Sequence, residues 1–140
     1  MTAARSTRSR RRPRVKRARP GFASIAIKRV YDEALAEDGV RILIDRLWPR
    51  GLSKAALKFE AWPRELAPSN ELRKWYGHEP QRFAEFCRRY RKELAEHNDD
   101  LAALRAMIKG RSATLLTATR ELELSHAQVL REVLRGKGES

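Results

Sequence analysis

The sequence predicts an α/β fold, in which a small, mainly parallel sheet of about three to four strands is flanked by helices and preceded by a disordered basic N-terminal arm. Segments with strand and helix patterns follow in the order strand, strand, helices, strand, helix. The 140 residues, 41% of them hydrophobic, suffice for one core. The charge of the first 20 residues is entirely positive. We therefore expect an arm at residues 1–21 and a single α/β domain at residues 22–140.

The predicted arm is rich in arginine. Residues 1–20 contain nine Lys or Arg and no acidic residue. Such a segment repels itself and has no apolar face to bury, which predicts disorder. Removing these nine bases from the chain's 31 leaves 22 bases against 18 acids, so most of the net charge of +13 lies in the arm.

Two interpretations of the arm stay open. Clustered basic side chains neutralise phosphates without reading base sequence, which predicts a nucleic-acid partner. The alternative is a dispensable extension of the domain. The first interpretation assigns nucleic-acid contacts to Arg10, Arg11, Arg12, Arg14, Lys16, Arg17 and Arg19.

Two strands are predicted first in the domain. Residues 24–31 alternate in polarity and are rich in β-branched side chains, as in a half-buried strand. A turn at residues 38–39 leads to a second strand at 40–47, which is more continuously apolar and hence more central. The Pro and Gly of residues 48–51 end it, and Ser53 is placed to cap one short helix.

Helices fill the middle of the sequence. Ser69 can cap a short helix that ends at Gly77, and Pro80 suits the first turn of the next. Two helices follow from apolar stripes at helical spacing: Phe83, Phe86, Cys87, Tyr90 and Leu94, then Leu101, Leu104, Met107 and Ile108. Cys87 is therefore assigned to the core.

A third strand and a last helix complete the domain. Residues 114–119 read as a buried strand, and Ser125 can cap a helix that ends at Gly136. The long helical connection makes the second and third strands parallel. The direction of the first strand stays open.

Basic residues follow both of these parallel strands. Arg46, Trp48 and Arg50 come after the second strand, and Arg120 and His126 come after the third. Parallel strands end at the same edge of a sheet, where ligands of α/β proteins bind. Guanidinium groups beside the first N–H groups of a helix make an anion site. His126 could donate a hydrogen bond there or act as a catalytic acid or base.

Trp75 and His78, which lie between two predicted helices, could reach the same edge. The structural alternative pairs Arg46 and Arg120 with nearby carboxylates and bonds His126 to a backbone carbonyl. The sequence leaves both interpretations open.

Other kinds of site are not expected. The three His lack metal-ligand spacing, so no metal is predicted, and no phosphate-binding or dinucleotide-binding glycine motif is present, so no cofactor is predicted. The longest uncharged apolar run, residues 113–118, is too short to cross a membrane, so no membrane partner is expected. With one Cys, the default localisation is cytoplasmic.

Three blocks of the sequence resemble a known family: VRILIDRLWPRGLSK, LAPSNELRKWYGHEPQRFAEFCRRYRKEL and TLLTATRELELSHAQVLREVL. In this order they resemble the DUF488 family, in particular its YeaO-like branch, over residues 25–135. The resemblance implies a compact α/β domain with no established activity. The family's recurring positions fall on Arg46, Trp48, Pro49, Arg50, Gly51, Pro68, Ser69, Trp75, Gly77, His78, Arg120 and His126.

The sequence departs from the family at residues 121–125, where relatives have a more acidic, Asn-containing stretch before the last His. Whether the domain is an enzyme stays open. The functional hypothesis is an anion-binding domain for a phosphate or nucleotide-like ligand, with or without catalysis. Its ligand-binding residues would be Arg46, Trp48, Arg50, Trp75, His78 and Arg120, with His126 as the catalytic candidate. The alternative is a nucleic-acid-binding module that uses the arm.

Overall fold

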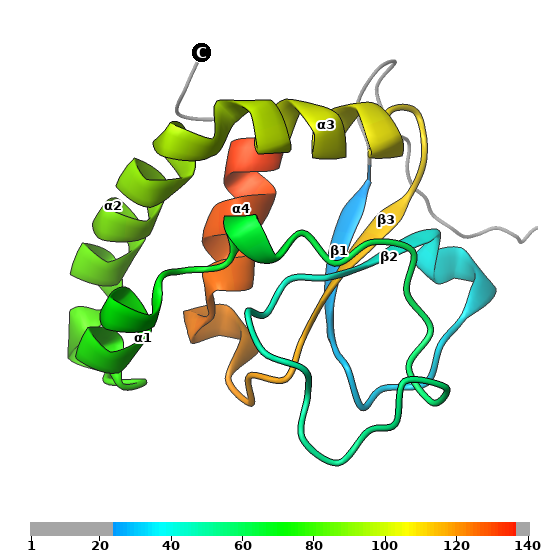
Figure 1. The fold of residues 1–140 in the computed structure, drawn as a ribbon, viewed down its shortest axis with the longest axis horizontal. Helices are drawn as coiled ribbons and strands as arrows, with labels where there is room; N and C mark the ends of the chain where they lie inside the picture. Colours follow the sequence, from blue (N-terminus) through cyan, green and yellow to red (C-terminus); the bar gives the residue numbers. More distant parts are fainter. Residues whose placement is uncertain (1–23, 137–140) are drawn as a thin grey trace, which may run out of the picture.

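The computed structural model describes residues 24–136, so the predictions for the arm lie outside the described residues. Three strands form one sheet: β1 (Ile25–Arg29), β2 (Val40–Leu43) and β3 (Ala113–Thr117). Their order is β1-β3-β2, and both outer strands pair in parallel with β3 (Figure 1). The predicted parallel pairing of the second and third strands is confirmed. The first strand, whose direction the sequence left open, is parallel as well.

The connection from β1 to β2 contains no α-helix. It passes through a short 3₁₀ turn at Ala36–Asp38 and enters β2 through Gly39, which has φ of +67°. Gly39 lies against the backbone of Ser112 just before β3, and a Cβ there would lie 2.1 Å from the Ser112 carbonyl oxygen. Only glycine allows this close approach, which lets a short segment cross from one edge of the sheet to the other.

Four α-helices lie between and after the strands: α1 (Asn70–Tyr76), α2 (Phe83–Leu94), α3 (Asn98–Ile108) and α4 (His126–Leu134). In Figure 1, α2 and α4 lie together on one side of the sheet, and α3 crosses above them. The main core lies between this helical layer and the sheet, and Ile42, Leu115, Tyr90 and Leu130 are completely buried there. Periodic burial of one face explains why the stripes found in the sequence form helices.

The other face of the sheet is covered by side chains from residues 48–62, which lack an α-helix. A second cluster joins Leu43 and Leu116 of the sheet to Leu57, with Trp48 and Trp62 packed against it. The predicted short helix after Ser53 is wrong. Ser53 instead caps a single turn through the amide of Ala56, because this Pro-rich and Gly-containing segment follows the sheet surface rather than coiling.

Two further predictions about burial are tested. Cys87 is half-buried and packs against the main core, as expected. Met107, which was assigned to a buried stripe, is 39% exposed because α3 buries only Leu101, Leu104 and Ile108. Within residues 24–136, no helix has the length and apolarity needed to cross a membrane.

Candidate functional site

A cavity of about 570 Å³ opens at the carboxyl ends of β2 and β3. Its walls come from residues 45–50 after β2, residues 118–121 and 124–126 after β3, and a third group near the start of the helical layer: Pro68, Arg73, Tyr76, His78 and Phe86. The parallel arrangement of β2 and β3 is what brings the first two segments together, as the sequence predicted.

The amino end of α4 forms part of this wall. Ser125 caps the helix by accepting a hydrogen bond from the Ala127 amide at 3.3 Å, and its hydroxyl donates to the Leu122 carbonyl at 2.7 Å. His126, the first residue of α4, therefore sits where the helix presents its positive dipole end.

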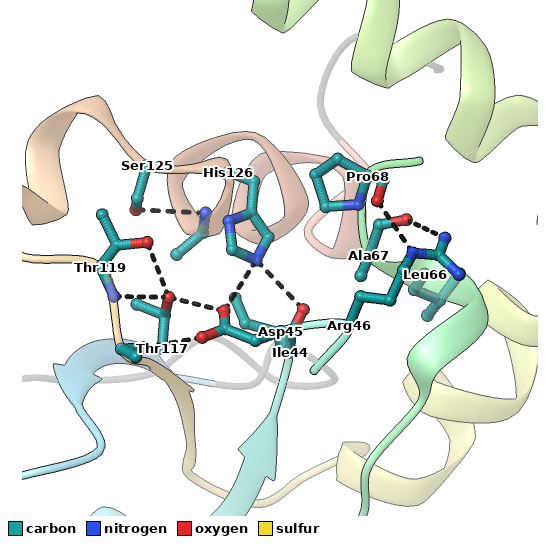
Figure 2. Close-up of polar contacts among 12 residues, drawn as sticks. Ile44, Asp45, Arg46, Leu66, Ala67, Pro68, Thr117, Thr119, Ser125 and His126 are labelled. Atoms are coloured by element: carbon teal, nitrogen blue, oxygen red, sulfur yellow. Dashed lines mark hydrogen bonds and ion pairs between the residues drawn. The ribbon is translucent and has the colours of Figure 1, made fainter. Parts of the chain in front are cut away.

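Asp45 is the acidic group at the base of the site (Figure 2). Its carboxylate accepts hydrogen bonds from the Thr117 hydroxyl at 2.7 Å and the Ala118 amide at 2.8 Å. Its Oδ1 also lies 3.3 Å from Nε2 of His126. Burial raises the pKa of Asp45, but the bond and charge of His126, with the Ala118 and Thr117 donors, outweigh burial and lower the pKa overall. Asp45 is therefore an ionised carboxylate near neutral pH.

His126 uses one ring nitrogen to bind the protein. In Figure 2, both contacts of the ring start at Nε2, which lies 3.1 Å from the Ile44 carbonyl oxygen and 3.3 Å from Asp45. The ring also meets Tyr90 edge-on, with centroids 5.9 Å apart. The carbonyl contact is one that the structural alternative foresaw. Nδ1 has no hydrogen-bond partner among residues 24–136 and is not a buried atom.

The arginines at the cavity divide into two kinds. Arg46 is committed to the fold, because its guanidinium donates to the carbonyls of Ala67 and Pro68, both at 3.1 Å (Figure 2). Arg50 and Arg120 are exposed, and their guanidinium groups have no hydrogen-bond or ion-pair partner within the described residues. The carboxylate pairs that the structural alternative assigned to Arg46 and Arg120 are therefore not formed.

The predicted aromatic residues differ in position. Trp48 lines the cavity, but its ring also packs edge-on against Phe59 and Trp62 and its Nε1 donates to the Leu52 carbonyl at 2.6 Å. Trp75 does not line the cavity. Its ring lies below two guanidinium groups, those of Arg89 at 4.3 Å and Arg82 at 5.4 Å.

His78 lines the cavity and is exposed. Its φ is 60°, the one positive φ among non-glycine residues of the described chain, and its ring lies 5.9 Å from that of Tyr76. Gly77, which ends α1 with φ of 53°, starts this left-handed turn.

The sequence singled out neither Arg73 nor Tyr76 for the site. It placed Asp45 at the end of the second strand, at the same edge, but not among the ligand-binding residues. Arg73 and Tyr76 lie one helical turn apart in α1, so they share a face, and this spacing was the signal that could have found them.

Residues 24–136 contain no candidate metal site, because no group of three His, Cys, Asp or Glu side chains comes together there. The cavity therefore offers a carboxylate–imidazole pair, two unpaired guanidiniums and a further arginine, Arg73, which bonds the Asn70 side chain at 2.8 Å. This arrangement can bind an anion and exchange hydrogen bonds with it.

Comparisons with known proteins agree with the resemblance seen in the sequence. Residues 24–139 match the family described as "Inactive DUF488-N3 subclade". The uncharacterized protein YeaO of Escherichia coli (strain K12) is 43% identical over 112 residues, which cover 80% of this chain and 97% of YeaO. The uncharacterized protein Rv3073c of Mycobacterium tuberculosis (strain ATCC 25618 / H37Rv) is 42% identical over 113 residues, covering 81% of this chain and 95% of the relative.

No solved structure matches the chain with significance. The family match spans all of the described residues, and both relatives are covered almost completely. The chain therefore belongs to the DUF488 family, as a YeaO-like member of its Inactive DUF488-N3 subclade.

Proposed function

We propose that the cavity binds a phosphorylated, nucleotide-like small molecule. The observation that carries this proposal is the pair of unpaired guanidinium groups, Arg50 and Arg120, at one cavity. An arginine that stabilises the fold has a carboxylate or carbonyl partner, as Arg46 does. Arginines without partners beside a cavity are matched to an anionic ligand, which they bind through paired N–H donors.

The charges around the cavity support an anion rather than a cation. Asp45 already accepts three hydrogen bonds or ionic contacts from the protein, so its oxygens are engaged within the fold. Glu121 is the other acid of the cavity wall, and the same wall holds three arginines, Arg50, Arg73 and Arg120, that are available to a ligand. A volume of about 570 Å³ accommodates a ligand as large as a nucleoside monophosphate.

We propose binding rather than turnover as the activity. The family is described as inactive. Nε2 of His126 is bound to the protein. The cavity wall includes no Cys that could act as a nucleophile beside Nδ1, the free nitrogen of this ring. In this proposal His126 contacts the ligand by hydrogen bonding, and the role of catalytic acid or base assigned to it in the sequence is left to the experiment.

Calorimetric titration of the full chain with adenosine 5′-monophosphate tests the proposal. We expect Arg50→Gln and Arg120→Gln each to lower affinity by about 10-fold to 100-fold, because each removes a charge-assisted hydrogen bond worth about 1.5–3 kcal/mol. Chromatography of the same samples shows whether the nucleotide is converted, and this distinguishes binding from catalysis.

Arg135→Gln is the matched control, because Arg135 is an exposed arginine at the end of α4 and does not line the cavity. It should leave affinity within about 2-fold of the unchanged protein. Equal affinity in all three variants would refute the assignment of the site, and accumulation of a product would refute binding without turnover.

A further inference from the structure

We propose that Asp45 is a positioning residue, which holds a proton on Nε2 of His126 so that the free Nδ1 accepts a hydrogen bond from a hydroxyl group of the phosphorylated ligand. This inference rests on the proposed function and narrows the ligand to a phosphate ester that carries a free hydroxyl, such as a sugar phosphate. Its first half concerns the protein alone and can be tested without a ligand.

The contacts of Nε2 determine where the proton lies. The Ile44 carbonyl oxygen at 3.1 Å and Asp45 Oδ1 at 3.3 Å are both acceptors, so Nε2 must donate to them. The alternative tautomer would place a lone pair against two oxygen atoms. In a neutral imidazole the proton on Nε2 leaves Nδ1 as an acceptor.

Asp45 can impose this tautomer because its own orientation is fixed. The Ala118 amide donates to Oδ2 at 2.8 Å, and the Thr117 hydroxyl donates to Oδ1 at 2.7 Å. These donors come from the end of β3, whereas Asp45 follows β2, so the sheet itself holds the carboxylate against the ring. The Asp45 and His126 side chains are 18% and 11% exposed, which limits competition from water.

The imidazole is also held in place. Tyr90 is completely buried, meets the ring edge-on, and is itself fixed by a hydrogen bond of 2.5 Å from its hydroxyl to the Leu66 carbonyl. Nδ1 is thereby left as the polar atom of the ring that a ligand can reach, since it has no partner among residues 24–136 and is not buried.

The chemistry of Nδ1 selects the ligand. A nitrogen lone pair repels a phosphate oxygen but accepts a hydrogen bond from a hydroxyl. The guanidiniums of Arg50 and Arg120 suit the phosphate, and Nδ1 suits a donor elsewhere on the same molecule. Doubly ionised methyl phosphate carries no hydroxyl and satisfies the arginines alone, whereas a sugar phosphate satisfies both.

Long-range ¹H–¹⁵N spectra of the full chain measure the tautomer directly. At about pH 8.5, above the ordinary histidine pKa of about 6.5, we expect His126 to show a protonated Nε2 and an unprotonated Nδ1. His78→Asn and His97→Asn assign the signals by removal, because the chain has three His. An unprotonated Nε2 in the unchanged protein overturns the inference, and this result needs no variant at residue 45.

Asp45→Asn tests the role of the carboxylate. The Ala118 amide requires the oxygen of the new side-chain amide at the Oδ2 position, which turns the NH₂ group toward Nε2 and favours a proton on Nδ1. We expect a measurable population of the Nδ1–H tautomer. A folded variant that keeps the original tautomer would show that the Ile44 carbonyl suffices, and it would overturn the role of Asp45.

Affinity measurements distinguish the ligand class inferred here from the proposed function on which it rests. At the same pH, ribose 5-phosphate should bind the unchanged protein several-fold tighter than methyl phosphate, because one neutral hydrogen bond contributes about 0.5–1.5 kcal/mol. Asp45→Asn should reduce this ratio toward one. Equal binding of both esters by the unchanged protein overturns the ligand class while the proposed function stands. Binding of neither ester overturns the ligand class, and the titration with adenosine 5′-monophosphate then decides whether the proposed function stands.

Discussion

At the scale of the residue, Gly39 carries the most demanding steric requirement in the described chain. Its φ is +67°, and an added Cβ would lie 2.1 Å from the Ser112 carbonyl oxygen and 2.6 Å from its carbonyl carbon. Both atoms belong to the backbone that leads into β3, so the clash cannot be relieved by turning a side chain. The glycine is required by the close approach as well as by its backbone angle.

We therefore expect Gly39→Ala to destabilise the fold by at least about 2 kcal/mol, since strained backbone costs about 1–3 kcal/mol before the clash is added. Chemical denaturation followed by circular dichroism measures this loss. Gly51→Ala is the matched control, because Gly51 has φ of +85° and no atom within 4 Å of the added Cβ. A loss for Gly39→Ala no larger than that of the control would contradict the steric argument.

At this scale, the sequence predicted which side chains meet at the sheet edge better than it predicted their partners. The convergence of Arg46, Arg50, Arg120 and His126 follows from parallel strands that end at one edge. That Arg46 binds the carbonyls of residues 67–68 could not be predicted, because those carbonyls come from a loop 21 residues away whose path depends on the whole fold.

At the scale of the element, β1 and β2 are linked by an ionic cluster on the sheet face opposite the helices. Asp38 is 4% exposed and lies between Lys28 of β1 at 3.0 Å and Arg41 of β2 at 2.5 Å. Burial raises the pKa of Asp38, but the Leu35 amide and the two cations outweigh burial and lower the pKa overall. The cluster thus needs the carboxylate in its ionised form.

This pKa gives the sign of the acid dependence. Because the folded-state pKa of Asp38 is below its unfolded value, the cluster contributes its full stability above about pH 4 and loses it as the pH falls through the folded-state pKa. Asp45 acts in the same direction. We expect the midpoint of thermal unfolding to be constant near neutral pH and to fall below about pH 4.

Asp38→Asn isolates the cluster. It should lower stability at pH 7 by on the order of 2 kcal/mol, less than for a fully buried pair because the Lys28 side chain is 20% exposed. It should also make the fall of the unfolding midpoint below about pH 4 less steep. If the midpoint of thermal unfolding falls as steeply at acid pH in Asp38→Asn as in the unchanged protein, groups other than Asp38 cause the acid dependence.

The elements themselves were largely predictable where one face is buried. Apolar side chains at helical spacing specify α2 and α4, because α4 packs on the sheet and α2 packs on α4. The helix expected after Ser53 is absent because residues 48–62 cover a sheet face as an irregular chain, in which Trp48 and Trp62 pack against the second cluster. Such packing leaves no periodic signal in the sequence.

At the scale of the whole molecule, most of the net positive charge lies in the residues that precede the domain matched by the family. The family match starts at residue 24, whereas nine of the 31 basic residues lie in residues 1–20. The nucleic-acid function proposed for this segment is therefore separable from the function proposed for the cavity. Each can be removed without changing the residues of the other.

We expect the full chain to bind a short DNA duplex with an affinity that falls steeply with salt, because about nine neutralised phosphates give a slope of about −8 in log K against log salt. Deleting residues 1–20 should abolish this binding and leave the affinity for adenosine 5′-monophosphate unchanged. Fluorescence anisotropy over a salt series measures DNA binding by the full chain and by the shortened chain. Unchanged DNA affinity after the deletion would refute the nucleic-acid function of this segment.

The central claim is that a phosphorylated ligand occupies the cavity between the ends of β2 and β3. Two-dimensional ¹H–¹⁵N spectra of the full chain, titrated with ribose 5-phosphate, test it most directly. We predict saturable shifts concentrated in the amides of residues 45–48, 50 and 118–126, which line the cavity or flank its lining residues. Shifts confined to residues outside these segments, or no shift at saturating ligand, would contradict the claim.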